Sequence, residues 1–139
     1  MAIFLSLEWV SAYRDAINAN PLYREAAATW NFGALALVCK AKADAGLTED
    51  VAIWLDLHLG QCRDARLMTA ADVATTPFVL IAEYDRWKQV IKGDLDPIKA
   101  LLQGKIRLKG NLSTVVRFVG ASKVLVATAS QVGTQFADE

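Results

Sequence analysis

The most regular hydrophobic pattern lies at residues 51–59, where every second side chain is apolar. The residues between them include Trp54, Asp56 and His58, so the two sides of an extended chain differ sharply. A period of two with one apolar side predicts a strand whose inner face is buried. Residues 31–42 predict a second strand, apolar on both sides and therefore covered on both faces. Further strands are predicted at 62–70, 78–82 and 105–109.

Helical spacing of apolar residues dominates the two ends of the chain. Ser6 precedes one such pattern, which Asn20 and Pro21 end, and a second short helix is predicted at 22–29. Residues 112–132 predict one long helix with almost no polar side. A helix that is apolar all round must be buried, or covered by a ligand or a partner.

The segment 87–110 contains its own stop and start signals. Gly93 ends one short helix, and Asp96 followed by Pro97 begins another. Gly104 ends that second helix, after which 105–109 alternate as a strand. Two short helices and an edge strand within so few residues form an unusual combination.

This segment resembles the signature of the sterol carrier protein 2 family. Residues 93–97 are similar to its Gly-(Asp/Glu)-Leu-Asp-Pro motif, and 104–110 to its Gly-Lys-(Ile/Leu)-x-(Ile/Leu)-x-Gly motif, with Trp87 in the preceding helix. Asp56-Leu57 resembles a pair in the second strand of the family. The C-terminal helix is longer and more apolar than in animal members, nearer to stand-alone bacterial relatives. The resemblance implies a small lipid-binding fold with an apolar tunnel and no catalysis.

We therefore expect one α+β domain over residues 1–139, with a five-stranded, mainly antiparallel sheet covered on one face by helices. The helices at both chain ends and a pair within 84–103 should pack on the apolar face of the sheet. An apolar tunnel is expected between the two layers. Its predicted ligand-binding residues are Leu35, Leu37, Ile53, Leu55, Leu57, Phe78, Leu80, Trp87, Leu101, Leu102, Ile106, Leu108, Phe118 and Leu125.

Composition supports this interpretation without proving it. Of the 139 residues, 54% are hydrophobic, against roughly 45–50% in an average globular chain. The excess must form a core, an oligomer interface or a ligand cavity. A filled core and a cavity both require apolar walls, so only the family resemblance distinguishes them.

Charge argues against nucleic-acid binding, because fifteen basic residues balance fifteen acidic ones. The only basic group is Lys105, Arg107 and Lys109, which alternation assigns to the exposed face of an edge strand.

Catalytic and metal-binding signals are weak. His58 lies beside Asp56 in the predicted strand, but no nucleophile stands at a recognisable turn. Cys39 and Cys62 lack metal-ligand spacing, and the 93–96 segment lacks the ligands of a calcium loop. We expect no enzyme activity, metal or cofactor. Without a signal peptide or a peroxisomal ending, we expect a cytoplasmic protein with free thiols.

The predicted function is non-catalytic binding and transfer of a fatty acyl chain, acyl-CoA, phospholipid or sterol-like lipid. Membrane contact is expected to be transient at most, and a homodimer or a lipid-handling enzyme could be a partner. The alternative is a protein-interaction or dimerisation module that uses the apolar C-terminal helix. A carrier should retain lipid on purification, whereas an interaction module should change mass with concentration.

Overall fold

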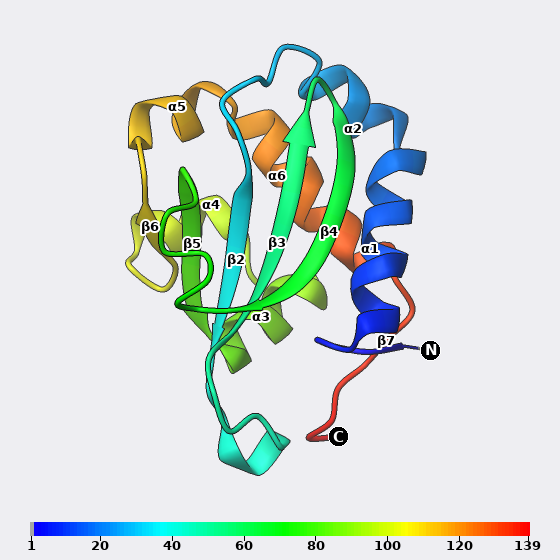
Figure 1. Ribbon diagram of the computed structural model, residues 1–139, viewed down its shortest axis with the longest axis vertical. Helices are drawn as coiled ribbons and strands as arrows, with labels where there is room; N and C mark the ends of the chain where they lie inside the picture. The colour runs from blue at the N-terminus through cyan, green and yellow to red at the C-terminus, as the bar shows by residue number, and fades with distance from the viewer. Residues whose placement is uncertain (1) are drawn as a thin grey trace.

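A computed structural model describes residues 2–139 (Figure 1). The strands are β1 (Ala2–Ile3), β2 (Leu35–Lys40), β3 (Val51–His58), β4 (Gln61–Thr69), β5 (Phe78–Glu83), β6 (Arg107–Lys109) and β7 (Thr134–Gln135). The helices are α1 (Leu7–Ala19), α2 (Pro21–Ala26), α3 (Tyr84–Ile91), α4 (Pro97–Leu102), α5 (Leu112–Arg117) and α6 (Val119–Thr128), with 3-10 turns at Ala43–Ala45 and Ala129–Gln131.

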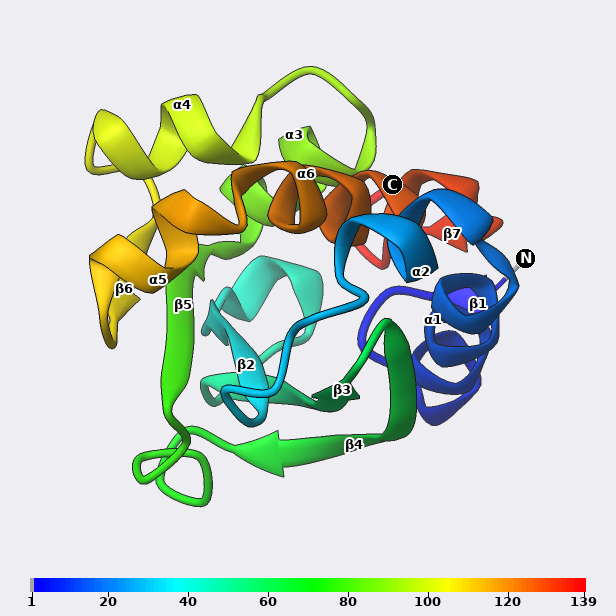
Figure 2. The same cartoon turned by 90° about the horizontal axis from the view of Figure 1, so that it is seen from above.

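The main sheet has the strand order β4-β3-β2-β5-β6. Strands β2 and β5 run parallel, and the other neighbouring pairs are antiparallel. The helices lie on one side of this curved sheet (Figure 2). The predicted α+β class and the mainly antiparallel, five-stranded sheet are therefore confirmed. A small parallel sheet of β1 and β7, which joins the two chain ends, was not predicted.

The inner face of the sheet forms the larger apolar core. Leu35, Leu37, Ile53 and Leu55 point toward the helices and are buried. The outer face of β2 is also covered, because Ala36 and Val38 belong to a second buried cluster with Val73, Ala52 and Val79. The prediction that this strand is covered on both faces is confirmed.

Strand β3 ends one residue before the alternating pattern does. His58 pairs with Gln61, which leaves Leu59 and Gly60 as a two-residue hairpin loop. Both loop residues have positive φ, 49° for Leu59 and 83° for Gly60, as a type I′ turn requires. Leu59 is 48% exposed, so its predicted place on the inner face was wrong.

The long C-terminal helix predicted at 112–132 was also wrong in extent. It is divided into α5 and α6 at Phe118, whose φ of −106° and ψ of 33° lie outside the helical region. The Phe118 ring packs against Trp30 and Phe32, with centroids 5.1 and 5.6 Å away. These rings come from a distant part of the chain, so the break reflects tertiary packing that local periodicity does not reveal.

Two strands are shorter than predicted. The chain turns at Gly33, whose φ of 106° precedes β2. The amides of Lys105 and Ile106 donate to the Ala100 carbonyl, at 2.8 and 3.2 Å, and these bonds close the end of α4. Strand β6 therefore starts only at Arg107.

Replacement of Leu55 tests the packing of the inner face. Its side chain has no exposed surface, and Leu55→Ala should lower the free energy of unfolding by about 2–5 kcal/mol through lost burial and a new cavity. Leu59→Ala is the matched control, expected to cost less than about 1 kcal/mol because Leu59 lies at the exposed turn. Chemical denaturation measures both, and equal losses would contradict the assigned core.

Candidate functional site

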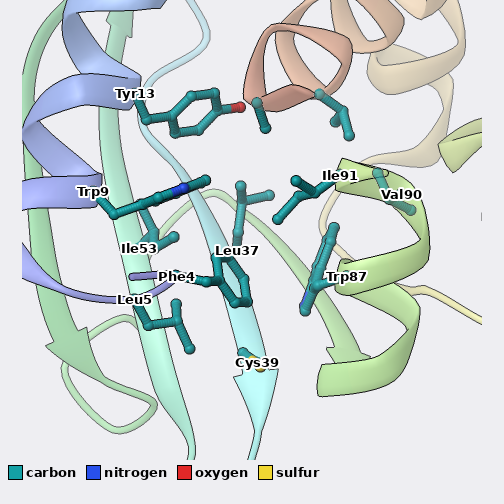
Figure 3. Close-up of a pocket in the computed structure, with 12 residues that line it drawn as sticks. Phe4, Leu5, Trp9, Tyr13, Leu37, Cys39, Ile53, Trp87, Val90 and Ile91 are labelled. Atoms are coloured by element: carbon teal, nitrogen blue, oxygen red, sulfur yellow. The ribbon is translucent and has the colours of Figure 1, made fainter. Parts of the chain in front are cut away.

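Three apolar hollows lie between the inner face of the sheet and the helices. The first has a volume of only about 20 Å³. Figure 3 shows Trp9 and Tyr13 of α1 on one side of it, and Trp87, Val90 and Ile91 of α3 on the other. The sheet forms the floor, with Leu37, Cys39 and Ile53. The remaining walls come from both ends of the chain: Phe4, Leu5, Val126 and Ala129.

The second and third hollows continue along the same layer. The second, of about 20 Å³, lies beside α2 and the α5–α6 break, and its walls include Tyr23, Trp30, Leu57, Phe118 and Ala121. The third, of about 30 Å³, lies beside α4, and its walls include Leu80, Pro97, Ile98, Leu101, Ile106 and Val115. Each hollow has room for about one or two water molecules, so a lipid fits there only if the surrounding side chains or helices move apart.

Helix α6 links the three hollows. Val126 lines the first and the third, while Ser122 and Leu125 line the second and the third. Trp87 and Leu35 also border two hollows each. The hollows are thus neighbouring spaces separated by a few side chains, and they follow the inner side of one helix.

Helix α6 is held in place by a buried hydrogen bond. The Tyr13 hydroxyl of α1 donates to the Leu125 carbonyl at 2.7 Å. Burial raises the pKa of Tyr13, so the hydroxyl keeps its proton and remains a donor at neutral and moderately alkaline pH. A second link joins the Asn20 amide to the Thr128 hydroxyl at 3.0 Å.

Most of the predicted ligand-binding residues do border the hollows, although their contact with a ligand stays a prediction. Leu55 and Phe78 are buried but border none of the three, and Leu108 is only half-buried. Leu102 is 76% exposed and is a wrong prediction, because it follows Leu101 by one helical step and points to the other side of α4. The predicted residues that line a hollow are Leu35, Leu37, Ile53, Leu57, Leu80, Trp87, Leu101, Ile106, Phe118 and Leu125.

Sequence reasoning missed the contribution of the chain ends. Phe4, Leu5, Trp9 and Tyr13 form one wall of the first hollow. The helical spacing of Trp9 and Tyr13 indicated a buried face, but nothing in that spacing distinguishes a residue that lines a cavity from one in a filled core.

The polar groups considered for chemistry have structural partners. The Asp56 carboxylate accepts from Arg63 at 3.0 and 3.1 Å rather than orienting His58. Asp96 accepts from the amides of Ile98 and Lys99, which lowers its pKa and begins α4. Burial raises the pKa of Cys39 and Cys62 to about 12, so both thiols stay protonated at neutral pH.

No charged side chain borders the three hollows in the described part of the chain. Within residues 2–139 there is likewise no cluster of three potential metal ligands. None of the helices described has both the length and the apolar character needed to cross a bilayer. The site therefore favours an apolar ligand held by shape and burial.

The C-terminal tail packs against Phe4 beside the first hollow. Asp138 accepts from Lys88 and Lys42 at 2.9 and 3.1 Å, and Glu139 accepts from Lys92 at 2.6 Å. These ion pairs hold the buried Phe136 ring, whose centroid is 5.7 Å from that of Phe4. Phe4 is itself a wall residue.

The ion pairs make the attachment of the tail sensitive to acid. Hydrogen bonds from Lys88 and then Lys42 lower the pKa of Asp138 below its ordinary value of about 3.9. A carboxylate with a lowered pKa stabilises the fold above its ordinary pKa, and this contribution is lost as the pH falls through the folded value.

Comparisons with known proteins agree with this geometry. The family model of the SCP-2 sterol transfer family matches residues 14–123. A crystal structure of sterol carrier protein 2 is 34% identical, with a TM-score of 0.87, and covers 94% of this chain and 99% of its own. A conserved hypothetical protein from Thermus thermophilus is also 34% identical, with a TM-score of 0.84, covering 100% of this chain and 95% of its own.

A more distant relation shows the fold alone. Sterol carrier protein 2 from Yarrowia lipolytica, in its apo form, is 18% identical with a TM-score of 0.57, and the match covers 94% of this chain and 95% of that one. No curated protein matches this chain. The resemblance first drawn from residues 87–110 is confirmed by the family match.

Replacement of Asp138 tests the closure of the tail. Asp138→Asn at pH 7 should speed hydrogen exchange of the Phe4 amide, which donates to the Gln135 carbonyl at 2.9 Å. In the wild type the same protection should fall below about pH 4, whereas in the variant it should already be low and change little.

The matched control is Asp15→Asn, because the Asp15 side chain is 70% exposed and, among residues 2–139, accepts only from the adjacent Arg14. Protection factors measured by NMR, corrected for the intrinsic exchange rate, decide the result. Wild-type protection in Asp138→Asn would show that the ion pairs do not hold the tail.

Proposed function

The chain belongs to the SCP-2 sterol transfer family, and on that premise we propose that it holds one long-chain lipid along α6 without chemically altering it. Lipid or sterol binding and transfer is the general property of the family. The observation that carries the proposal is that α6 contributes side chains to all three apolar hollows. A lipid chain that passed through all three hollows would lie along this one helix.

A flexible acyl chain fits this arrangement better than a sterol. The hollows are separated by side chains such as Leu35, Trp87 and Leu125. A chain with many rotatable bonds can pass around these side chains, whereas a rigid fused-ring skeleton needs one continuous space. Fatty acids, acyl-CoA and phospholipids all present such chains. Burial at about 25 cal/mol per Å² supports roughly micromolar affinity after the cost of association.

Helix α6 is the wall proposed to move when the lipid enters. Its displacement breaks no main-sheet hydrogen bond, because the links that tie it to α1 and α2 are made through the side chains of Tyr13, Asn20 and Thr128. The neighbouring break at Phe118 gives it a natural hinge. Elements held by few bonds are those that open locally.

The function in the cell is proposed to be transport rather than catalysis. We place the protein in the cytoplasm, with transient contact to a membrane or to a separate lipid-handling enzyme when the lipid is exchanged. Every wall of the three hollows is supplied by apolar or uncharged side chains, which supports binding without reaction.

One surface favours the alternative of a dimerisation module. Leu112 and Val116 are 51 and 57% exposed at helical spacing on α5, and Val119, the first residue of α6, is 36% exposed. If this stripe binds a second copy, the mass measured by light scattering should rise with concentration, and Val116→Glu should abolish the rise. A constant monomer mass would contradict it.

Narrowing the hollows tests the binding site. Ser122 is half-buried and borders two hollows, so Ser122→Phe should reduce the affinity for a fluorescent fatty acid by about tenfold or more while the protein stays folded. Ala127→Phe is the matched control on the exposed side of α6 and should bind like the wild type. Equal binding by both variants in a fluorescence titration would remove these hollows as the site.

Two changes with opposite effects test the movement of α6. Tyr13→Phe removes the bond to the Leu125 carbonyl and should speed ligand release. Gly120→Ala should slow it, because the added methyl group meets open space and favours the helix by about 1 kcal/mol. Stopped-flow release of a fluorescent fatty acid, with hydrogen exchange of α6 in the presence and absence of the lipid, measures both. Equal α6 protection with and without lipid would indicate a fixed wall.

A further inference from the structure

Charge is unevenly distributed along the chain. Residues 97–137 contain six basic residues and no acidic one, whereas the rest of the chain holds nine basic and fifteen acidic residues. The positive segment includes α4, β6, α5 and α6. The balanced net charge of the whole chain is therefore the sum of a positive segment and a negative remainder.

Most cations of this segment have no acidic partner. Within the described residues, Lys123 alone among the six forms an ion pair, with Asp96 at 3.8 Å. The Arg117 guanidinium instead lies over the ring of Phe32, 5.3 Å from its centroid. The five cations without an ion pair in residues 2–139 are all exposed, and they are Lys99, Lys105, Arg107, Lys109 and Arg117.

Charged residues from other elements do not cancel this charge. A surface hollow beside β6 is bordered by Lys105 and Arg107, and also by Lys40, Arg86 and the single carboxylate of Glu83. Of these four cations, only Lys40 has an acidic partner among the described residues. Like charges gathered on one surface attract an anionic partner.

Exposed apolar side chains lie on the same segment. Leu102 of α4, Leu112 and Val116 of α5, and Val119 at the start of α6 all reach solvent. Figures 1 and 2 place α4, β6 and α5 together at one edge of the molecule, with α1 at the opposite edge. Cations combined with exposed apolar side chains are typical of surfaces that bind the headgroup region of an anionic membrane.

The inner side of this segment forms the wall of the third hollow. Leu101, Ile106 and Val115 line that hollow, and the residue that follows each of them is exposed. The segment therefore separates the apolar interior from the cationic and apolar outer surface. The break at Phe118 lies directly after α5.

We propose that the edge formed by α4, β6 and α5 is the face with which the protein docks on an anionic lipid bilayer. This inference rests on the proposed function and identifies the surface used when a lipid is exchanged. Docking there brings the wall of the third hollow and the break before α6 to the bilayer surface. A second copy is a poorer partner, because a symmetric dimer places this cationic face against itself.

Cosedimentation with phosphatidylcholine vesicles, with and without phosphatidylglycerol, tests the docking face. The wild type should bind the anionic vesicles about tenfold or more tightly than the neutral ones, and added salt should reduce this preference. Lys105→Gln combined with Arg107→Gln should weaken binding to the anionic vesicles by about tenfold or more. The matched control is Arg14→Gln combined with Arg24→Gln, which removes the same charge from α1 and α2 and should bind like the wild type.

A second pair of variants tests the apolar part of the face. Leu112→Ser combined with Val116→Ser should weaken vesicle binding, because less apolar surface enters the headgroup region. Leu7→Ser combined with Leu22→Ser is the matched control, since both leucines are exposed on α1 and α2. The control should bind vesicles like the wild type. All four double variants should bind a fluorescent fatty acid with wild-type affinity, which also shows that they are folded.

Weaker vesicle binding by both edge variants, with both controls unchanged, supports the docking face. Equal vesicle binding by edge and control variants would overturn it, as would a wild type without preference for anionic vesicles. A mass that rises with concentration in light scattering, and no longer rises in the Leu112 and Val116 variant, would assign the edge to a second copy instead. These results leave the proposed function intact, which fails only if the wild type binds no fatty acid.

Discussion

The apolar inner face of β2 and β3 is the constraint on which the rest of the structure depends. Strands with Leu35, Leu37, Ile53 and Leu55 on one side must have that side removed from water. Helices α1, α3 and α6 supply the cover, and all three contribute to the same buried cluster. The cover is nearly complete, since gaps of only about 20, 20 and 30 Å³ remain along α6. A lipid occupies this apolar interior only if the surrounding elements move apart.

The attachment of α6 bears on how a lipid would reach this interior. Proteins close-pack their cores, so persistent gaps represent lost contacts. Here the gaps follow a helix that is fixed by two side-chain hydrogen bonds, from Tyr13 and Asn20, rather than by main-chain pairing. We propose that a lipid enters by displacing this helix, which then packs against the bound chain.

Local patterns in the sequence predicted the parts of the fold that local physics determines. The period-two pattern of 51–59 located β3, and the proline and glycine signals around Asp96 and Gly104 located α4. Contacts between distant residues decided the rest. The break at Phe118 depends on the rings of Trp30 and Phe32. The first hollow depends on Phe4, which lies in an N-terminal segment without a recognised motif. Whether apolar residues enclose a cavity or form a filled core depends on three-dimensional packing. No local sequence pattern reveals that packing.

Native mass spectrometry of the protein purified from cells, followed by solvent extraction and identification of the released molecules, tests the central claim most directly. The account predicts a fraction of molecules with one additional mass that matches a lipid carrying a long acyl chain. Extraction should remove this mass and leave a folded protein that takes up added fatty acid in a ratio of one to one. A homogeneous, ligand-free protein that remains folded and takes up no lipid on addition would contradict the account.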